Sequence, residues 1–505
     1  MKRFLILLVS IGLVIGIGAA GFAIYRSNST GPDPKPTAEN PPAGLARFYA
    51  QDLKWTKCDD DVCTKVKVPI DYEKPTGDTI ELALRRVRAT GAGGSVIFTN
   101  PGGPGGSATD FVNYVASSVS DEIRKTYDIV GLDPRGVGES SPMECLSDAD
   151  FDAFIDIDPD PDNDEEIAAV RDSVRNMGKA CARNSGALAG HVSTEETARD
   201  HDIVRALLGQ KKMIWLGFSY GTQLGATYAE LFPEKVGRMV LDGSVDVTLD
   251  SIGQGLGQAE GFQLALESYL KNCLDEDVCP VGDSVANASA NIAKMLAALD
   301  ANPITVPSGR KLTVGRAFYG IAMSLYSRES WDYLTTALEG LAKGDGRVML
   351  ILSDAYFERK PDGSFADNSG QAIYAINCMD TDDAPNLAET QAVLPAFRKA
   401  SPVFGAALGW GVMACNDWPI KAPHPQQAVK AAGTSPILVV GTTKDPATPY
   451  KWSEAMAEQL ESGVLLTREG DGHTAYLSGN KCIQAAVDKY LLTGVAPDDG
   501  TVCGE

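Results

Sequence analysis

The sequence predicts an α/β protein with a mostly parallel central sheet and a large α-helical cap inserted into it. Short apolar, strand-like runs alternate with helix-like segments, which is the βαβ pattern of a parallel sheet. Residues 217–221 read Gly-Phe-Ser-Tyr-Gly and join one such run to a helix rich in small residues. Ser219 and Asp445, which follow two of the expected strands, lie 226 residues apart. One βα step consumes far fewer residues, so a long insertion must separate them.

The individual elements follow from hydrophobic periodicity. Residues 66–70 and 80–88 alternate between apolar and polar side chains and predict an antiparallel start. Apolar runs then predict further strands at 95–99, 127–132, 213–217, 237–241, 436–441 and 463–467. Helical patterns within the insertion lie at 258–270, 286–299, 314–325, 331–341 and 387–400. We therefore expect a first core part (45–244), a helical cap over the cleft (245–425) and a second core part (426–505).

The Gly-x-Ser-x-Gly turn predicts a nucleophile. Between a strand and a helix, this pattern holds the serine on a tight turn with its hydroxyl facing the cleft. Isolated matches are often plain turns, but here an apolar run at 212–216 precedes the turn and the small-residue helix 220–231 follows it. Ser219 is therefore the predicted nucleophile.

A serine nucleophile needs a base and an acid that orients it, and the chain has only four histidines. His191 and His201 precede the serine, and His201, between two aspartates on a helix, is expected at the solvated surface. His424 lies between two prolines in a loop. His473 lies in a glycine-rich loop directly after the strand 463–467, where a loop-borne base belongs. It is the predicted general base.

The acid should follow the preceding strand, and Asp445 does so after 436–441. The 28 residues from Asp445 to His473 leave room for one helix and one strand. Asp471 is the rival, but it is badly placed to hold the imidazole because it lies two residues away on the same loop. We thus predict that Ser219 attacks a carbonyl, His473 transfers the proton and Asp445 orients the imidazole.

A tetrahedral intermediate also needs backbone donors for its oxyanion. The N–H of Tyr220, which follows the nucleophile, should be one donor. The loop 100–107, Asn-Pro-Gly-Gly-Pro-Gly-Gly-Ser, follows the strand 95–99 and should supply the other. It lacks the Lys-Ser/Thr of a phosphate-binding loop, and we choose Gly103 as the second donor.

These segments together resemble a known family. The loop 100–107, the segment Asp-Pro-Arg-Gly-Val-Gly-Glu-Ser at 133–140, the turn 217–222 and the tail with Asp445 and His473 are similar to the secreted bacterial tripeptidyl aminopeptidases. These are α/β-hydrolases related to prolyl aminopeptidases. The resemblance runs from about residue 50 to the C-terminus. It implies an α/β-hydrolase fold and release of short peptides, usually tripeptides, from a free N-terminus.

An aminopeptidase of this kind must hold a protonated amine, which requires carboxylates in the pocket. Asp380 and Asp417, each close to a cysteine, are the first candidates, followed by Glu260. Thr448, three residues after Asp445, is expected to line the pocket or to stabilise a turn.

The N-terminus predicts export. Residues 4–24 carry no charge and follow Lys2 and Arg3, so 1–26 is a signal peptide or an N-terminal anchor, and 27–44 reads as a flexible linker. An even number of cysteines fits five disulfides in an oxidising compartment. Sequence proximity favours the pairs Cys58–Cys63, Cys273–Cys279 and Cys482–Cys503, with Cys145–Cys181 and Cys378–Cys415 completing the set, although connectivity stays open at this point. The protein should be secreted or tethered to the outer face of the membrane.

Charge and composition narrow the partners. A net charge of −22 without a basic stripe excludes nucleic acid as a partner. Aspartates at every second position from 156 to 164 are expected to form a solvated acidic loop, with calcium a lesser alternative, and no metal or cofactor is expected. Two other functions remain: an esterase or thioesterase acting on envelope lipids, and a non-catalytic envelope binding protein. The oligomeric state is not determined by the sequence.

Overall fold

The computed structural model describes residues 34–91, 93–423 and 425–504. A ten-stranded sheet forms its centre, in the order β1-β2-β3-β5-β4-β6-β7-β10-β11-β12. The strands are β1 (Thr56–Cys58), β2 (Asp61–Pro69), β3 (Thr79–Val87), β4 (Ser95–Asn100), β5 (Tyr127–Leu132), β6 (Met213–Phe218), β7 (Val236–Asp242), β10 (Ile437–Lys444), β11 (Gly463–Asp471) and β12 (Thr501–Cys503). β3 is antiparallel to both β2 and β5, and all pairs from β5 to β12 are parallel. The predicted fold class is confirmed; β1 and β12 are short strands that periodicity did not indicate.

Helices cover both faces of the sheet, which explains why its central strands are apolar on both sides. Neighbouring residues of a strand point to opposite faces. In β4, Phe98 belongs to the apolar core beneath α7 (Thr194–Leu207) and α8 (Tyr220–Leu231). Ile97 belongs to the core beneath α3 (Ala108–Ser118), α4 (Asp121–Thr126) and α18 (Lys481–Thr493). The parallel arrangement brings the carboxyl ends of β4, β6, β7, β10 and β11 to one edge.

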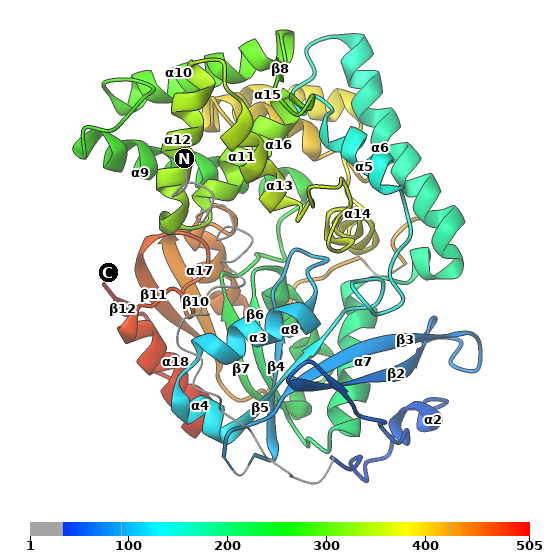
Figure 1. Ribbon diagram of the computed structural model, residues 1–505. Helices are drawn as coiled ribbons and strands as arrows, with labels where there is room; N and C mark the ends of the chain where they lie inside the picture. The colour runs from blue at the N-terminus through cyan, green and yellow to red at the C-terminus, as the bar shows by residue number, and fades with distance from the viewer. Residues whose placement is uncertain (1–33, 92, 424, 505) are drawn as a thin grey trace.

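Between β7 and β10 the chain forms the helical insertion. Its helices lie together above the sheet in Figure 1. Its helices are α9 (Ser251–Asp275), α10 (Val285–Ala301), α11 (Val314–Leu325), α12 (Trp331–Ala342), α13 (Arg347–Tyr356), α14 (Ser369–Asp380), α15 (Leu387–Ala400) and α16 (Gly405–Gly411). Every helix expected from periodicity is present, while α13, α14 and α16 were not predicted. The insertion has an apolar core of its own, centred on α9 to α13.

Two helices from the first part of the chain also join the insertion. α5 (Asp148–Ile155) and α6 (Asp164–Ser185) lie beside α14 (Figure 1). The Arg316 guanidinium, on α11, pairs with Asp152 at 2.8 Å and with Asp156 at 2.5 Å, and Arg359 pairs with Asp152 at 2.7 Å. The sequence grouped this segment with the core, but its ion pairs connect it to the cap.

The N-terminal region is attached to the core where it is described. The N–H of Thr37 donates to the carbonyl of Ala206, and Glu39 pairs with Arg205 and Lys235. This part of the predicted linker is therefore attached to the core, because the Glu39 carboxylate forms ion pairs with Arg205 and Lys235. The predicted signal or anchor, 1–26, lies outside the described residues. Within the described ranges, no helix is both long enough and apolar enough to cross a bilayer.

All ten cysteines are paired in the structure. The disulfides are Cys58–Cys63, Cys145–Cys181, Cys273–Cys279, Cys378–Cys415 and Cys482–Cys503. Three of them are the pairs that sequence proximity favoured, and Cys145–Cys181 and Cys378–Cys415 are the two that were expected to complete the set. Cys378–Cys415 connects α14 with the segment after α16, so it cross-links two parts of the cap.

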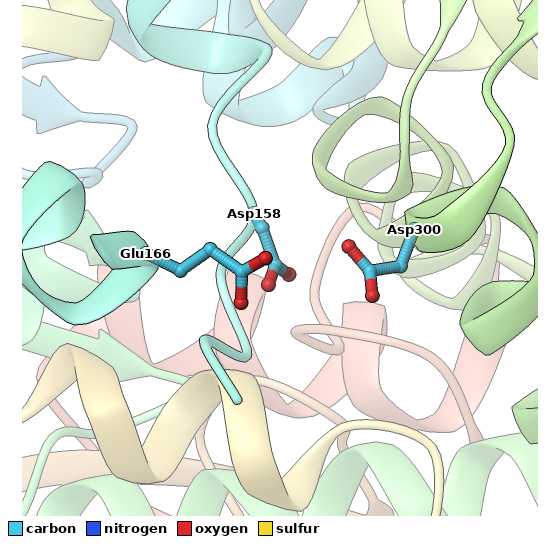
Figure 2. Close-up of side chains that lie close together, drawn as sticks. All are labelled: Asp158, Glu166 and Asp300. Atoms are coloured by element: carbon cyan, nitrogen blue, oxygen red, sulfur yellow. The ribbon is translucent and has the colours of Figure 1, made fainter. Parts of the chain in front are cut away.

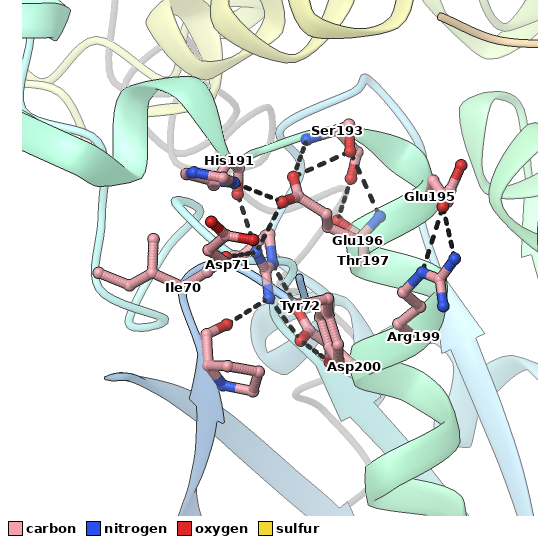
Figure 3. Close-up of polar contacts among 12 residues, drawn as sticks. Ile70, Asp71, Tyr72, His191, Ser193, Glu195, Glu196, Thr197, Arg199 and Asp200 are labelled. Atoms are coloured by element: carbon pink, nitrogen blue, oxygen red, sulfur yellow. Dashed lines mark hydrogen bonds and ion pairs between the residues drawn. The ribbon is translucent and has the colours of Figure 1, made fainter. Parts of the chain in front are cut away.

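A buried ionic cluster fixes the start of α7 against the edge of the sheet. The Arg135 guanidinium donates to both oxygens of Asp200 at 2.8 Å and to the carbonyls of Ile70 and His191. His191, Glu196 and Asp200 lie together beside β2 (Figure 3). Removing one partner of such a pair would leave a buried charge uncompensated, so the cluster fixes the position of α7.

His201 was expected at the surface and is instead buried, on the face of α7 that meets the sheet. Its ring packs edge-on against Trp215 at 5.1 Å, and its Nδ1 lies 2.8 Å from the Thr197 carbonyl. Burial lowers its pKa to about 4, so the ring is neutral. The flanking aspartates suggested a solvated surface, but Asp200 is paired with Arg135, and Asp202 is paired with Arg205 and Lys235, so both charges are compensated inside the protein.

Candidate active site

Ser219 lies at the turn between β6 and α8. Its φ of 54° and ψ of −125° are unusual for a residue with a side chain and are those of a strained elbow. The turn requires glycine nearby, since a Cβ on Gly217 would lie 2.3 Å from the carbonyl oxygen of Gly221. The serine is thus held on a tight strand-to-helix turn, as its flanking residues predict.

Asp445 directly follows β10, His473 lies two residues after the end of β11, and the two side chains are hydrogen-bonded. The imidazole Nδ1 lies 2.8 Å and 2.9 Å from the two carboxylate oxygens of Asp445. Three backbone N–H groups, those of Ala447, Thr448 and Thr474, also donate to this carboxylate. Asp445 is 1% exposed, so its orientation is fixed by these bonds. The Thr448 hydroxyl, 3.3 Å from Nδ1, lies beside the same pair.

The environment of His473 favours the charged ring over the neutral one. Burial opposes the imidazolium, but the negative charge of Asp445 and its hydrogen bond outweigh burial and raise the pKa of His473 above its usual 6.5. The ring therefore binds a proton more readily than a free imidazole does, as the predicted role of general base requires.

Asp242, at the end of β7, connects the nucleophile turn with the histidine loop. Its carbonyl accepts the N–H of Ser219 at 2.9 Å. Its buried carboxylate accepts the N–H groups of Ala475 and Tyr476, which follow His473 closely. Burial raises the pKa of Asp242 to about 6, against the opposing effect of these bonds. The sequence analysis missed this residue, although an acid ending a strand next to the elbow was a visible signal.

The glycine loop after β4 lies directly against the nucleophile. A Cβ on Gly102 would lie 2.8 Å from Cβ of Ser219 and 3.0 Å from the nitrogen of Tyr220. Among the described residues, the N–H groups of Gly103 and Tyr220 have no hydrogen-bond acceptor. Unpaired N–H groups on this loop and turn are the kind of donor that an oxyanion requires, so Gly103 and Tyr220 stay the predicted donors.

Asn100 is hydrogen-bonded to this loop. The sequence analysis named it only as part of the loop 100–107 and gave it no role of its own. Its side chain is fully buried, and its Oδ1 accepts the N–H of Gly102 at 3.0 Å. Its Nδ2 has no partner in the described part of the chain. The amide therefore sets the position of the loop relative to Ser219.

Replacing Asn100 by alanine should lower kcat about 10- to 100-fold with a smaller change in KM, because a displaced loop misplaces the donors. Thr99→Val is the matched control: it removes one buried hydrogen bond, to the Leu216 carbonyl, from the same strand without touching the loop. Steady-state kinetics and Tm of both variants would test this. Equal losses of kcat in the two variants would contradict the role of Asn100.

The other predicted residues are dispersed. Asp417 pairs with Arg171 and Arg175 of α6. Glu260 is exposed and pairs with Lys451. Both carboxylates are thus already neutralised by cations of the chain.

Asp380 differs from them because it is buried beneath the nucleophile helix. It accepts from the N–H and the hydroxyl of Thr194 at 2.7 Å and 2.6 Å. The same hydroxyl lies 2.6 Å from the phenol of Tyr220. Burial raises the pKa of Asp380 to about 7, and no cation of the described residues is paired with it.

Three acidic side chains meet far from this site. The carboxylates of Asp158, Glu166 and Asp300 have oxygens within 4.8 Å of one another, where the α5–α6 loop meets the end of α10 (Figure 2). Burial, with repulsion from neighbouring carboxylates, raises the pKa of Asp158 to about 6. The expected solvated acidic loop is therefore partly enclosed by the cap.

The burial of the Asp158 carboxylate, together with this repulsion, should make the protein more stable in mild acid. Because the pKa of Asp158 is higher in the folded state, the folded chain binds more protons and stability falls as pH rises from about 4 to about 6. Asp158→Asn should raise Tm at pH 7.5 and have little effect at pH 4.5, measured in a chelating buffer. The exposed Asp78→Asn is the control. A lower Tm of Asp158→Asn at pH 7.5 would contradict the repulsion.

Comparison with known proteins agrees with this geometry. Residues 96–285 match the family model described as alpha/beta hydrolase fold, and residues 401–503 match the model described as TAP-like protein. Serine protease Hip1 of Mycobacterium tuberculosis is 36% identical over 90% of this chain and 91% of its own length. Carboxylesterase B of the same species is 34% identical over 98% and 97%. Tripeptidyl aminopeptidase of Streptomyces lividans is 32% identical over 89% and 86%. The chain therefore belongs to the tripeptidyl aminopeptidase family of α/β-hydrolases and is a serine hydrolase.

Proposed function

We propose that the protein is an exported serine exopeptidase that releases tripeptides from the free N-terminus of peptides. The observation that carries the proposal is the hydrogen-bonded pair of Asp445 and His473. Asp242 connects this pair to the strained turn at Ser219, because its backbone carbonyl binds the N–H of Ser219 and its carboxylate binds the N–H of Ala475. The relatives named serine protease and tripeptidyl aminopeptidase support a peptide substrate.

In the proposed reaction, Ser219 attacks the carbonyl carbon while His473 takes the hydroxyl proton. The N–H groups of Gly103 and Tyr220 bind the oxyanion. His473 then gives the proton to the leaving amine, and the peptide bond breaks to leave an acyl-enzyme. Water attacks this ester with His473 as base, which releases the tripeptide and restores Ser219.

We assign the protonated N-terminus of the substrate to Asp380. Of the three candidate carboxylates, Asp417 and Glu260 already have cationic partners, while Asp380 has only neutral donors among the described residues. An arriving ammonium group would lower the pKa of Asp380 and stabilise its charged form.

The location proposed for this activity is outside the cytoplasm. The structure contains five disulfides. In ordinary proteins, disulfides form and persist in oxidising compartments and are rare in the cytosol. Export would depend on the uncharged residues 4–24.

Hydrolysis of carboxylic esters is the second candidate, favoured by the similarity to carboxylesterase B over nearly the whole chain. The same serine, histidine and aspartate would serve it. Asp380 separates the two candidates, since an amine anchor has no use in an esterase for neutral substrates.

The experiment compares a fluorogenic tripeptide amide, free or N-acetylated, with a short-chain ester. Serine-dependent release from the free tripeptide that acetylation abolishes would support the exopeptidase. Asp380→Asn should then raise KM for the free tripeptide. Ester turnover without amide cleavage would transfer the assignment to the esterase, and loss of both activities would overturn both.

A further inference from the structure

The cap contacts the predicted base at Tyr326, which follows α11. Its carbonyl accepts the backbone N–H of His473 at 2.9 Å. Its ring lies edge-on to the imidazole, with 5.3 Å between the ring centroids. A Cβ on Gly472 would lie 3.1 Å from the same carbonyl, so the glycine permits this close approach. The cap therefore meets the catalytic loop at the base itself.

From Tyr326, a row of aromatic rings continues through the cap. Tyr356, at the end of α13, lies 6.5 Å from Tyr326 and 4.9 Å from Tyr319 of α11. Beyond burial, the phenol of Tyr356 raises the pKa of Tyr326, and the phenol of Tyr374, on α14, raises the pKa of Tyr319, so each pair of phenols interacts. Tyr374 meets Phe154 of α5 at 5.4 Å. We call Tyr319, Tyr326, Tyr356 and Tyr374 the tyrosine cluster.

The cluster also approaches the oxyanion loop. A Cβ on Gly105 would lie 2.9 Å from the carbonyl oxygen of Ser369 and 3.2 Å from Cβ of Ala372, on the helix that carries Tyr374. The row of rings thus extends from the base side of the site toward the glycine loop. Substrate residues next to a peptide bond held at Ser219 would therefore contact this row of rings.

The tyrosines are surrounded by protein but still partly accessible. All four side chains are partly exposed to solvent. Even so, loss of solvation by burial is the main reason that the pKa of each phenol is raised. A side chain that is desolvated and yet reached by solvent lines a recess rather than a convex surface. No charged side chain of the described residues is hydrogen-bonded to these hydroxyls. The four phenols are therefore aromatic and uncharged, and the carboxylate that, after burial, adds to the raised pKa of Tyr326 is that of Asp445.

We propose that the tyrosine cluster receives the side chain of the substrate residue whose carbonyl Ser219 attacks, and that it selects a large apolar or aromatic residue there. The assignment rests on the proposed exopeptidase function. The leaving part of the substrate is a chain of any length and needs an open exit. The acyl part is short, so an enclosed surface beneath the cap suits it. Aromatic rings without charge favour apolar side chains through burial and edge-to-face contacts.

The test uses the full chain and the amides Ala-Ala-X with one constant fluorogenic leaving group, where X is glycine, alanine, leucine or phenylalanine. The wild type should prefer phenylalanine to alanine about 10- to 100-fold in kcat/KM, the range expected for burial of one large side chain. Tyr356→Ala and Tyr374→Ala should reduce this ratio to about threefold or less.

A second variant protects the test against a folding defect. Tyr374→Trp keeps an aromatic ring but fills the recess, so it should shift the preference toward alanine while Tm stays near that of the wild type. Tyr333→Ala is the matched control, since Tyr333 is a half-buried tyrosine of α12 outside the cluster. An unchanged ratio in Tyr356→Ala, Tyr374→Ala and Tyr374→Trp would overturn the proposal.

Esters of one phenol separate this proposal from the peptidase proposal. If no peptide amide is cleaved, 4-nitrophenyl acetate and 4-nitrophenyl 3-phenylpropanoate report the acyl preference alone. A preference for the phenylpropanoyl group that the cluster variants lose would support the cluster and reject the peptidase. No dependence on acyl size in the wild type would overturn the cluster assignment.

Discussion

Replacing Ser219 by alanine is expected to lower kcat about 10⁶-fold, because the acyl-enzyme can no longer form and the remaining groups do not act independently. The fold should be retained, since the side chain makes no capping hydrogen bond in α8. Kinetics with the free tripeptide amide would measure the loss. Labelling by a fluorophosphonate, read by mass spectrometry, would identify the modified residue.

Ser324→Ala is the control for this experiment. Ser324 is a buried serine of the cap whose hydroxyl donates to the Gly320 carbonyl. It should keep its activity and its labelling at Ser219. A Ser219→Ala variant that retained most of its activity, or a label on another serine, would reject the proposed nucleophile.

Replacing Asp445 by asparagine should lower kcat about 10⁴-fold, since an amide favours the wrong imidazole tautomer. The base must be neutral, so the rate falls as pH drops through the pKa of His473. In the wild type the midpoint of this acid limb of the pH–rate profile should lie above pH 6.5, because Asp445 raises the pKa of His473. In Asp445→Asn the limb should move to lower pH.

Asp471→Asn is the control, because Asp471 ends β11 two residues before His473 and was the rival for the acid. It pairs with Lys444 at 3.4 Å, and the histidine is hydrogen-bonded to Asp445 instead. The pH–rate profile of this variant should retain the wild-type limb. A larger loss of kcat in Asp471→Asn than in Asp445→Asn would exchange the two assignments.

The structural setting of the site was predictable where the signal was local. The turn at Ser219, the apolar runs that became β4, β6 and β10, and the glycine loop at 100–107 are each recorded in a few consecutive residues. The order of serine, acid and base follows from the order of the strands. Helices with strong periodicity, such as α11, were also predictable.

Weaker elements were not. α14 begins with Ser369 and Gly370 and shows no clear apolar stripe, so it was not predicted, although it carries Tyr374 and Asp380. Its helix is stabilised by contacts with the glycine loop and by the disulfide of Cys378, which are tertiary interactions.

The fold class, the family and the residues proposed for the chemistry follow from local sequence patterns, because turn geometry and strand pattern depend on near neighbours. Which charges are already neutralised is visible only in the folded chain. Asp417 is paired with arginines of α6, whereas Asp380 lacks a cation among the described residues. Folding also places Tyr326 against His473 and Asp242 beneath Ser219. These contacts join segments far apart in the chain, and their strength depends on burial, which a linear pattern does not record.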